Sequence, residues 1–349
     1  MSKRNFCLFL LCASVFFTSA EASVRQPVKP FNDCDPIAFC LTLSLHPFEY
    51  IKADNNWEIL NALQIPHSIN QLDSMGIKCN KSQLMFLKVG GLVSQKNDLW
   101  QRSIPIFGRQ ETEKIRQFSR SIAEEVFKVN EAGYRNYIKI LGKEGFKDNA
   151  FSLLFSCLLD GIAWEDYVTS YEEIGDYATW KGVTWVLDSP RKTLEVGTNG
   201  FGHLKTTWSY EQAHWANSSM MVAFNKEYKE KGIITDENLK RQLMEYDLVD
   251  NGGNLKIPAI DSQADNEINR QGKIILDNNK NEVKKFLPEF MSLTKISRKD
   301  IATIILYHEL MWDTLELLQE KNIAQMPKIL YSKDCPKKDM KNIVFWVSR

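Results

Sequence analysis

Glu211 and His214 have the most suggestive spacing for metal or acid–base chemistry among the histidines and carboxylates of this chain. They are three positions apart, which places a carboxylate and an imidazole on one face of a helix. His203 could complete such a site if the chain folds back on itself. Because this spacing is common by chance and has no second copy in the chain, we predict neither a metal ion nor a cofactor.

Two well-known catalytic motifs are missing from the sequence. Trp312, and not a second histidine, stands four residues after His308, which excludes the zincin motif HExxH. The nucleophile motif GxSxG does not occur either. The sequence therefore predicts no specific catalytic residue.

Acidic residues cluster before and within the aromatic part of the chain. Asp160, Glu165 and Asp166 form one group, and a second group follows at 172–176. Two carboxylates that flank a bond can act as acid and base in glycoside hydrolysis. A solvated helix face explains such clusters more simply, so a hydrolase is an alternative and not the main prediction.

The stretch from Trp164 to Trp215 is rich in aromatic residues. It holds ten of them in 52 residues, about twice the chain average of 11%. Aromatic rings with polar neighbours suit sugar rings and peptide side chains, although a buried seam would have the same composition. Asn199 and Gly200 indicate a tight hairpin turn within the stretch. The predicted ligand-binding residues are Trp180, Trp185, Asn199, Phe201, His203, Trp208, Glu211 and His214.

Two related halves must position these residues. The pair Ile104-Pro105 recurs as Ile257-Pro258, and Trp164 recurs as Trp312. The offsets between matched segments fall steadily along the chain, through 156, 153, 152, 148 and 146 residues. This drift indicates a divergent tandem duplication. We predict a first half at 53–196, an aromatic and glycine-containing junction at 197–214, and a second half at 215–349.

Each half opens with short helices and a hairpin. In the first half the helical candidates begin near Trp57, at 67–75 and at 81–89, and strands follow at 92–93 and 99–107. The second half has helices at 216–228 and 235–246, with a hairpin between 248 and 260.

This order of elements resembles winged-helix domains over residues 56–107 and 215–260. The resemblance implies a third helix that enters the DNA major groove, with Lys81 and Lys88 on it and Lys96 and Arg102 in the wing. The second copy departs from this pattern because its helix carries acidic residues. A scaffold for packing or protein contact is therefore favoured over DNA binding.

Helices and two strands complete each half. We expect helices at 111–129, 134–141, 148–171 and 301–319, the third of them deep in the core, and strands at 183–187 and 343–347. The predicted fold class is α+β, mainly helical, as two divergent copies of a winged-helix-like unit with additional helices and short β-hairpins.

The N-terminus has the pattern of a signal peptide. Lys3 and Arg4 precede an apolar run at 6–17, and a small-x-small cleavage site ends at Ala22. Residues 1–22 are therefore assigned to the signal, and 23–52 to an irregular lead-in. Export to the periplasm or beyond would let Cys34 and Cys40 form a disulfide.

The sequence thus predicts an exported, soluble binding or interaction protein. Lys+Arg and Asp+Glu both number 44, and this balance argues against a nucleic-acid partner. A protein, peptide or glycan ligand at the aromatic junction is the main prediction, and no membrane span is expected in the mature chain. A secreted or periplasmic hydrolase and a winged-helix DNA-binding regulator are the alternatives.

Overall fold

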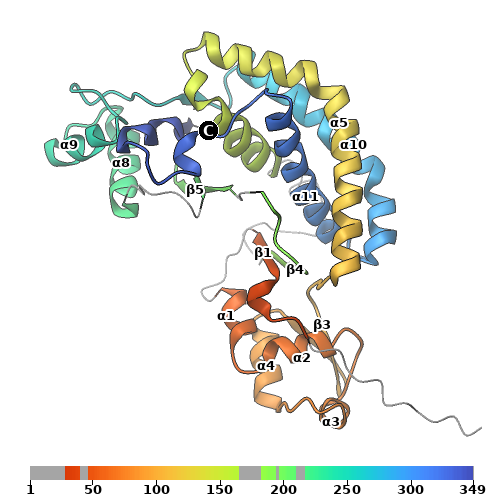
Figure 1. The fold of residues 1–349 in the computed structure, drawn as a ribbon. Helices are drawn as coiled ribbons and strands as arrows, with labels where there is room; N and C mark the ends of the chain where they lie inside the picture. The colour runs from red at the N-terminus through yellow and green to blue at the C-terminus, as the bar shows by residue number, and fades with distance from the viewer. Residues whose placement is uncertain (1–27, 40–45, 165–181, 194–195, 210–216, 349) are drawn as a thin grey trace, which may run out of the picture.

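The protein is a mainly helical α+β protein. The computed structural model describes residues 28–39, 46–164, 182–193, 196–209 and 217–348. Figure 1 shows a small unit of short helices below a larger curved body that is built from long helices. Among the described helices, none is both long and apolar enough to cross a membrane.

Two hydrophobic cores divide the chain between Ile104 and Phe107. The smaller core takes its side chains from 31–104 together with Val186. The larger core runs from Phe107 to Val347 and takes side chains from both predicted halves. The two halves therefore share one core, and the duplication itself stays a prediction.

The smaller unit contains the predicted short helices and hairpin. Helices α3 and α4 begin at capping boxes, in which Ser68 pairs with Gln71 and Asn80 pairs with Gln83. The hairpin pairs Val93 with Arg102. The elements of this unit are η1 (Phe31–Asp33), β1 (Asp35–Phe39), α1 (Pro47–Lys52), α2 (Asn56–Ala62), α3 (Ile69–Ser74), α4 (Lys81–Val89), β2 (Val93–Lys96) and β3 (Leu99–Arg102). The order of elements from α2 to β3 matches the predicted one, while the resemblance to winged helices stays a prediction.

The predictions of an irregular lead-in at 23–52 and of a strand at 99–107 need correction. Residues 35–39 form β1, which pairs antiparallel with β4 (Val183–Leu187), and residues 47–52 form α1. The partner strand lies about 150 residues away in the chain, so local sequence gave no sign of it. Strand β3 ends at Arg102 because the chain turns toward β4, where Val186 N donates to Pro105 O at 3.0 Å.

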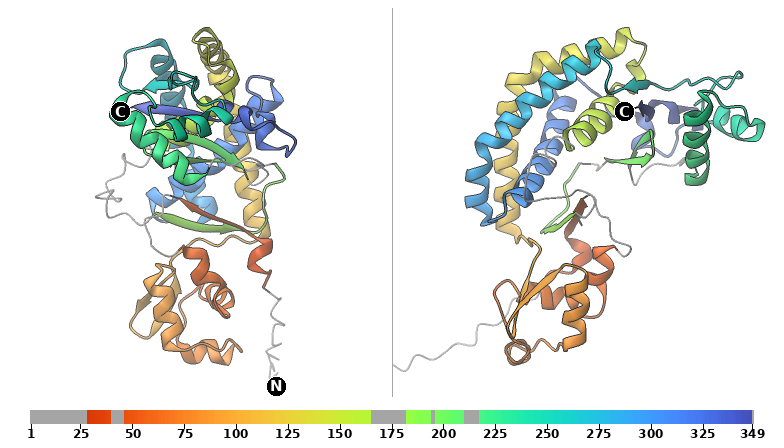
Figure 2. Two further views of the ribbon diagram at one scale, coloured as in Figure 1. Left: turned by 90° about the vertical axis from the view of Figure 1, so that its left-hand side faces the viewer. Right: turned by 180° about the vertical axis from the view of Figure 1, so that it is seen from behind.

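Long helices form the larger body. Helices α5 and α10 pack against each other, and α11 packs against both (Figures 1 and 2). Separate helices at 111–129 and 134–141 were predicted, but one continuous helix covers both. The helices of this body are α5 (Arg109–Lys143), η2 (Lys147–Asn149), α6 (Ala150–Ser152), the π-helix η3 (Leu153–Ile162), α8 (Ser218–Lys231), α9 (Glu237–Glu245), α10 (Glu267–Thr294), α11 (Lys299–Glu320), η6 (Lys328–Leu330) and η7 (Lys337–Asn342).

A four-stranded sheet closes one end of this body. Its strand order is β5-β6-β8-β7, and its strands are β5 (Val196–Phe201), β6 (Leu204–Ser209), β7 (Ala259–Asp261) and β8 (Val344–Ser348). The predicted hairpin exists, but its turn is at Gly202-His203, where Gly202 has a φ of 73°, and not at Asn199-Gly200. The second predicted hairpin, at 248–260, is a single bridge between Val249 and Leu255, because β7 pairs with β8 in parallel.

Some predicted repeat pairs occupy matching places. Trp346 N donates to Pro258 O at 2.8 Å, just as Val186 N donates to Pro105 O. In each half this contact is followed by a long helix and then a second one. The match fails for Asp188-Ser189-Pro190 and Asp334-Cys335-Pro336, the segments with the offset of 146 residues. Asp188 follows β4, whereas Asp334 precedes β8.

Candidate functional site

Several predicted site residues lie outside the described part of the chain. These residues are Trp180, Glu211, His214 and Cys40. Cys34 is described, and it carries a free thiol that is buried in the smaller core. Burial raises the pKa of this thiol. Because Cys40 lies outside the described residues, the disulfide from Cys34 to Cys40 stays a prediction.

Trp185 does not lie on a contact surface. Its side chain is fully buried in β4, edge-on to the ring of His308 with 5.1 Å between ring centroids. Sequence reasoning placed it in a binding groove because aromatic composition does not distinguish a buried seam from an exposed one.

The hairpin β5–β6 carries the other described candidates. Asn199 is exposed, whereas Phe201, His203 and Trp208 are half-buried. His203 stacks on Trp346 at 5.2 Å, and its Nδ1 lies 3.0 Å from Val347 O. These contacts fix the hairpin to the sheet, and no described contact brings its aromatic residues to Trp185.

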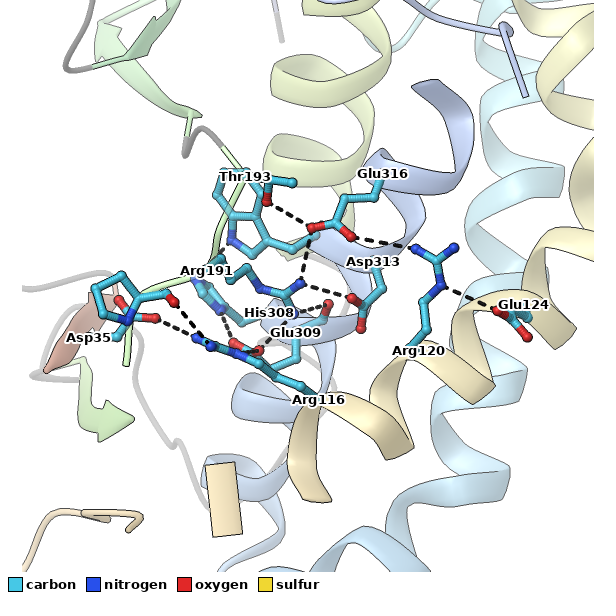
Figure 3. A network of polar contacts seen from close by, with 12 residues as sticks. Asp35, Arg116, Arg120, Glu124, Arg191, Thr193, His308, Glu309, Asp313 and Glu316 are labelled. Carbon is cyan, nitrogen blue, oxygen red and sulfur yellow. Dashed lines mark hydrogen bonds and ion pairs between the residues drawn. The ribbon is translucent and has the colours of Figure 1, made fainter. Parts of the chain in front are cut away.

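A network of ion pairs lies between α5, α11 and the loop after β4 (Figure 3). Arg191 donates to Glu309 Oε2 at 2.7 Å and to Asp313 Oδ1 at 2.8 Å. Arg116 donates to Asp35 Oδ2 at 2.9 Å and thereby ties β1 to the helical body. We call Asp35, Arg116, Arg191, Glu309 and Asp313 the ion-pair network.

Arg191 and Glu309 form the most buried ion pair of this network, with side chains that are 7% and 1% exposed. Burial alone would raise the pKa of Glu309, but the hydrogen bond from His308 and the charge of Arg191 outweigh burial and hold this pKa at about 2. The carboxylates of Glu309 and Asp313 raise the pKa of Arg191 above its ordinary value, against the effect of burial. Both partners are therefore charged at neutral pH.

His308 is engaged at both ring nitrogens. Its Nδ1 donates to Glu309 Oε1 at 3.0 Å, and its Nε2 accepts from Trp312 Nε1 at 3.4 Å. The Nε2 lone pair, which a general base would use, is occupied here by the indole N–H of Trp312. Among the described residues, no group of three or more His, Cys, Asp or Glu side chains could hold a metal ion. The network therefore fits a structural role.

Sequence reasoning missed this network, although a signal was present. Glu309, Asp313 and Glu316 recur at spacings of four and three residues in a helix whose other side chains are mostly buried. Carboxylates that face a core need cationic partners, and Arg191 supplies one here.

Asp160 is a second interior carboxylate, and it has a different environment. Its oxygens accept hydrogen bonds from Trp164 Nε1 at 2.9 Å and from the Thr198 hydroxyl at 2.5 Å. Burial outweighs these bonds and raises the pKa of Asp160 to about 6. Its predicted companions Glu165 and Asp166 lie outside the described residues.

A cavity opens along the π-helix. It has a volume of about 540 Å³ and lies between η3, α5, α10 and β7. Most of its walls are apolar, with Tyr137 and Cys157 among them. A smaller recess of about 150 Å³ shares Cys157, Ile162 and Ser262 with it and reaches Lys205. We call the larger space the π-helix cavity; its lining residues are Tyr137, Cys157, Leu158, Ile162, Ile260, Ser262, Ile268, Asn269, Gly272, Lys273, Leu276 and Asp277.

The surrounding residues support the π-helix. The Tyr307 hydroxyl donates to Leu159 O at 2.8 Å, and the hydroxyls of Ser156 and Thr207 lie 2.7 Å apart. Gly161 is required because a Cβ there would lie 2.8 Å from Ser156 O. π-Helical segments are rare and are frequently found at functional sites.

Gly272 lets α10 pack closely against the wall of the cavity. A Cβ on Gly272 would lie 3.0 Å from Leu158 Cδ1 and 3.6 Å from Tyr137 Cε2. At the rim, Lys273 and Asp277 are exposed and opposite in charge. The interior is therefore apolar, with a thiol and a phenol as its polarisable and polar groups.

No protein-family model, curated protein or solved structure matches this chain.

Proposed function

We propose that this protein binds a small, mainly apolar ligand in the π-helix cavity. The observation that carries the proposal is the cavity itself, about 540 Å³ of space between the π-helix and α10. Ligand sites in proteins typically measure about 300–1,000 Å³ and are mostly apolar with a few polar groups.

The position of the cavity agrees with a groove between the predicted halves. Tyr137 and Leu158 come from the first half, whereas Ile268 and Leu276 come from the second. The aromatic junction at 197–214 contributes Lys205 to the adjoining recess. The proposed contact surface therefore moves from the aromatic residues to the π-helix.

Export, hydrolysis and DNA binding stay predictions from the sequence. Export depends on residues 1–22, and the hydrolase alternative depends on Glu211 and His214, all of which lie outside the described residues. DNA binding would use Lys81 and Lys88 of α4, which are exposed. No specific observation favours either alternative over ligand binding.

A fluorescent probe tests the proposal directly. We expect the uncharged probe N-phenyl-1-naphthylamine to bind the purified protein saturably, with a rise in emission as it leaves water. Leu276→Trp places a larger side chain in the cavity, and it should weaken this binding at least tenfold.

A second hollow supplies the matched control. Ala223 lines a surface hollow between α8 and α9, which shares no lining residue with the π-helix cavity. Ala223→Trp should leave binding unchanged. If the wild-type protein shows no saturable binding, or if folded Leu276→Trp binds as well as the wild type, the proposal is wrong.

A further inference from the structure

We infer that the π-helix cavity selects an uncharged apolar ligand with one hydrogen-bond acceptor, such as a ketone or aldehyde carbonyl, placed against the Tyr137 hydroxyl. This inference rests on the proposed function and names the class of ligand. Tyr137 lies on α5, is 3% exposed and lines the cavity.

The Tyr137 hydroxyl differs from those of the other deeply buried tyrosines of the body. Tyr134, one turn earlier, bonds to Asn279 Oδ1 at 3.5 Å, and Tyr307 donates to Leu159 O at 2.8 Å. Within the part of the chain that the structure describes, the Tyr137 hydroxyl makes no hydrogen bond. Tyr hydroxyls in the interior usually have a partner, so a ligand acceptor in the cavity would supply the one that the described residues do not.

The missing group must accept a hydrogen bond. Burial, with the nearby Cys157 sulfur, raises the pKa of Tyr137 well above its ordinary value, so the phenol keeps its proton. A phenol in this state offers its O–H as a donor. A carbonyl oxygen is the simplest acceptor on an otherwise apolar molecule.

The charges around the cavity argue for a neutral ligand. The charged residues that line it are Lys273 and Asp277, which are exposed at the rim and cancel each other. A carboxylate bound next to Tyr137 would be buried without a cation, and burying an unpaired charge is strongly unfavourable.

The Cys157 sulfur suits an apolar ligand body beside the acceptor. Cys157 lines both the cavity and the smaller recess, and its sulfur is soft and polarisable. A ligand with its acceptor at Tyr137 would therefore pass Cys157 on its way toward the recess.

Two isosteric probes test this selection. The probes are 2-acetylnaphthalene and 2-isopropenylnaphthalene, which differ in C=O against C=CH₂. Each is measured by displacement of N-phenyl-1-naphthylamine from the full-length protein. Tyr137→Phe should weaken binding of the ketone about tenfold and binding of the alkene less than twofold. Tyr134→Phe, which removes a hydroxyl outside the cavity lining, should change neither.

The outcomes separate this inference from the proposed function. If both probes bind and Tyr137→Phe affects them equally, or affects neither, the carbonyl assignment is wrong while the cavity remains a ligand site. If neither probe nor N-phenyl-1-naphthylamine binds the wild-type protein, the proposed function fails and the inference fails with it. Urea unfolding of each variant verifies that it is folded during the titrations.

Discussion

The ion-pair network and the π-helix cavity lie in the same helical body, but their polar side chains have different surroundings. In the network, Arg191 bonds to two carboxylates, and its side chain is 7% exposed. In the cavity, Tyr137 lines about 540 Å³ of space, and no hydrogen bond joins its hydroxyl to the described residues. Ion pairs of this kind serve the fold, whereas a polar group that lines an open cavity is available to a ligand.

The carboxylates of Glu309 and Asp160 show the same contrast. Glu309 lies between two guanidinium groups, at 2.7 Å from Arg191 and 3.7 Å from Arg116, and its pKa is about 2. Asp160 accepts hydrogen bonds from neutral donors, and burial leaves its pKa at about 6. Charged donors at short range thus lower the pKa of Glu309, whereas neutral donors leave the pKa of Asp160 raised.

The largest effect should come from the network. Arg191→Met leaves Glu309 and Asp313 buried without their main cation, and we expect the free energy of unfolding to fall by about 3–5 kcal/mol. Urea unfolding followed by circular dichroism measures this loss. Probe binding to the folded variant should be unchanged, because Arg191 does not line the cavity.

An exposed ion pair is the control for this substitution. Arg135 pairs with Glu131 one turn away on α5, and both side chains are more than two-fifths exposed. Arg135→Met should cost no more than about 1 kcal/mol. Equal losses for the two variants would show that the network is not a structural support.

A smaller effect is expected at the π-helix. In Gly161→Ala the new Cβ would lie 2.8 Å from Ser156 O, which is backbone and cannot move aside cheaply. We expect a loss of about 1–3 kcal/mol in the free energy of unfolding, together with weaker probe binding because η3 shapes the cavity.

Gly142 supplies the matched control for Gly161. It lies in α5, and nothing stands within 4 Å of its Cβ position. Gly142→Ala should stabilise the protein by about 0.5–1 kcal/mol through helix propensity. If Gly161→Ala and Gly142→Ala change the free energy of unfolding by the same amount, Gly161 has no special role in the π-helix.

The smallest effect is a change in pH dependence at Asp160. Its pKa is 3.8 in the unfolded chain and about 6 in the folded protein, so the folded state favours the protonated form. This carboxyl therefore reduces stability as the pH rises from about 4 to 6, and has no such effect below about 4. Glu309 has the opposite sign, because its lowered pKa makes stability fall as the pH drops from 4.5 toward 2.

Asp160→Asn removes the carboxyl of Asp160 and so tests its contribution to the pH dependence of stability. The variant keeps an oxygen for Trp164 Nε1, and its stability relative to the wild type should rise between pH 4 and pH 6. Urea unfolding at several pH values from 3.5 to 7 measures the difference. Parallel curves for the two proteins would show that Asp160 titrates normally.

Much of the local structure could be predicted from the sequence. Apolar residues at helical spacing indicated α5 and α11, and β-branched and aromatic runs indicated strands at 183–187 and 343–347, close to β4 and β8. The glycine signal at 197–203 indicated a hairpin, although the turn is three residues later than expected. These helix, strand and turn patterns arise from residues that are close together in the chain, so they can be read from the sequence.

The candidate site could not be predicted in the same way. The apolar run around Cys157 indicated a core helix, but it gave no sign of π-helical pairing, which depends on contacts with Tyr307 and Thr207. The cavity joins Tyr137, Cys157 and Gly272, which are far apart in the chain and each resemble ordinary core residues.

The sequence by itself determined the mainly helical α+β class, the helical periods and the absence of known catalytic motifs, because these depend on composition and short spacings. The tertiary structure alone decided which buried groups are satisfied. Arg191 meets Glu309 across 118 positions of the chain, and Tyr137 meets no described acceptor at all. Whether a polar group finds a partner depends on packing between distant segments, and only the folded chain brings those segments together.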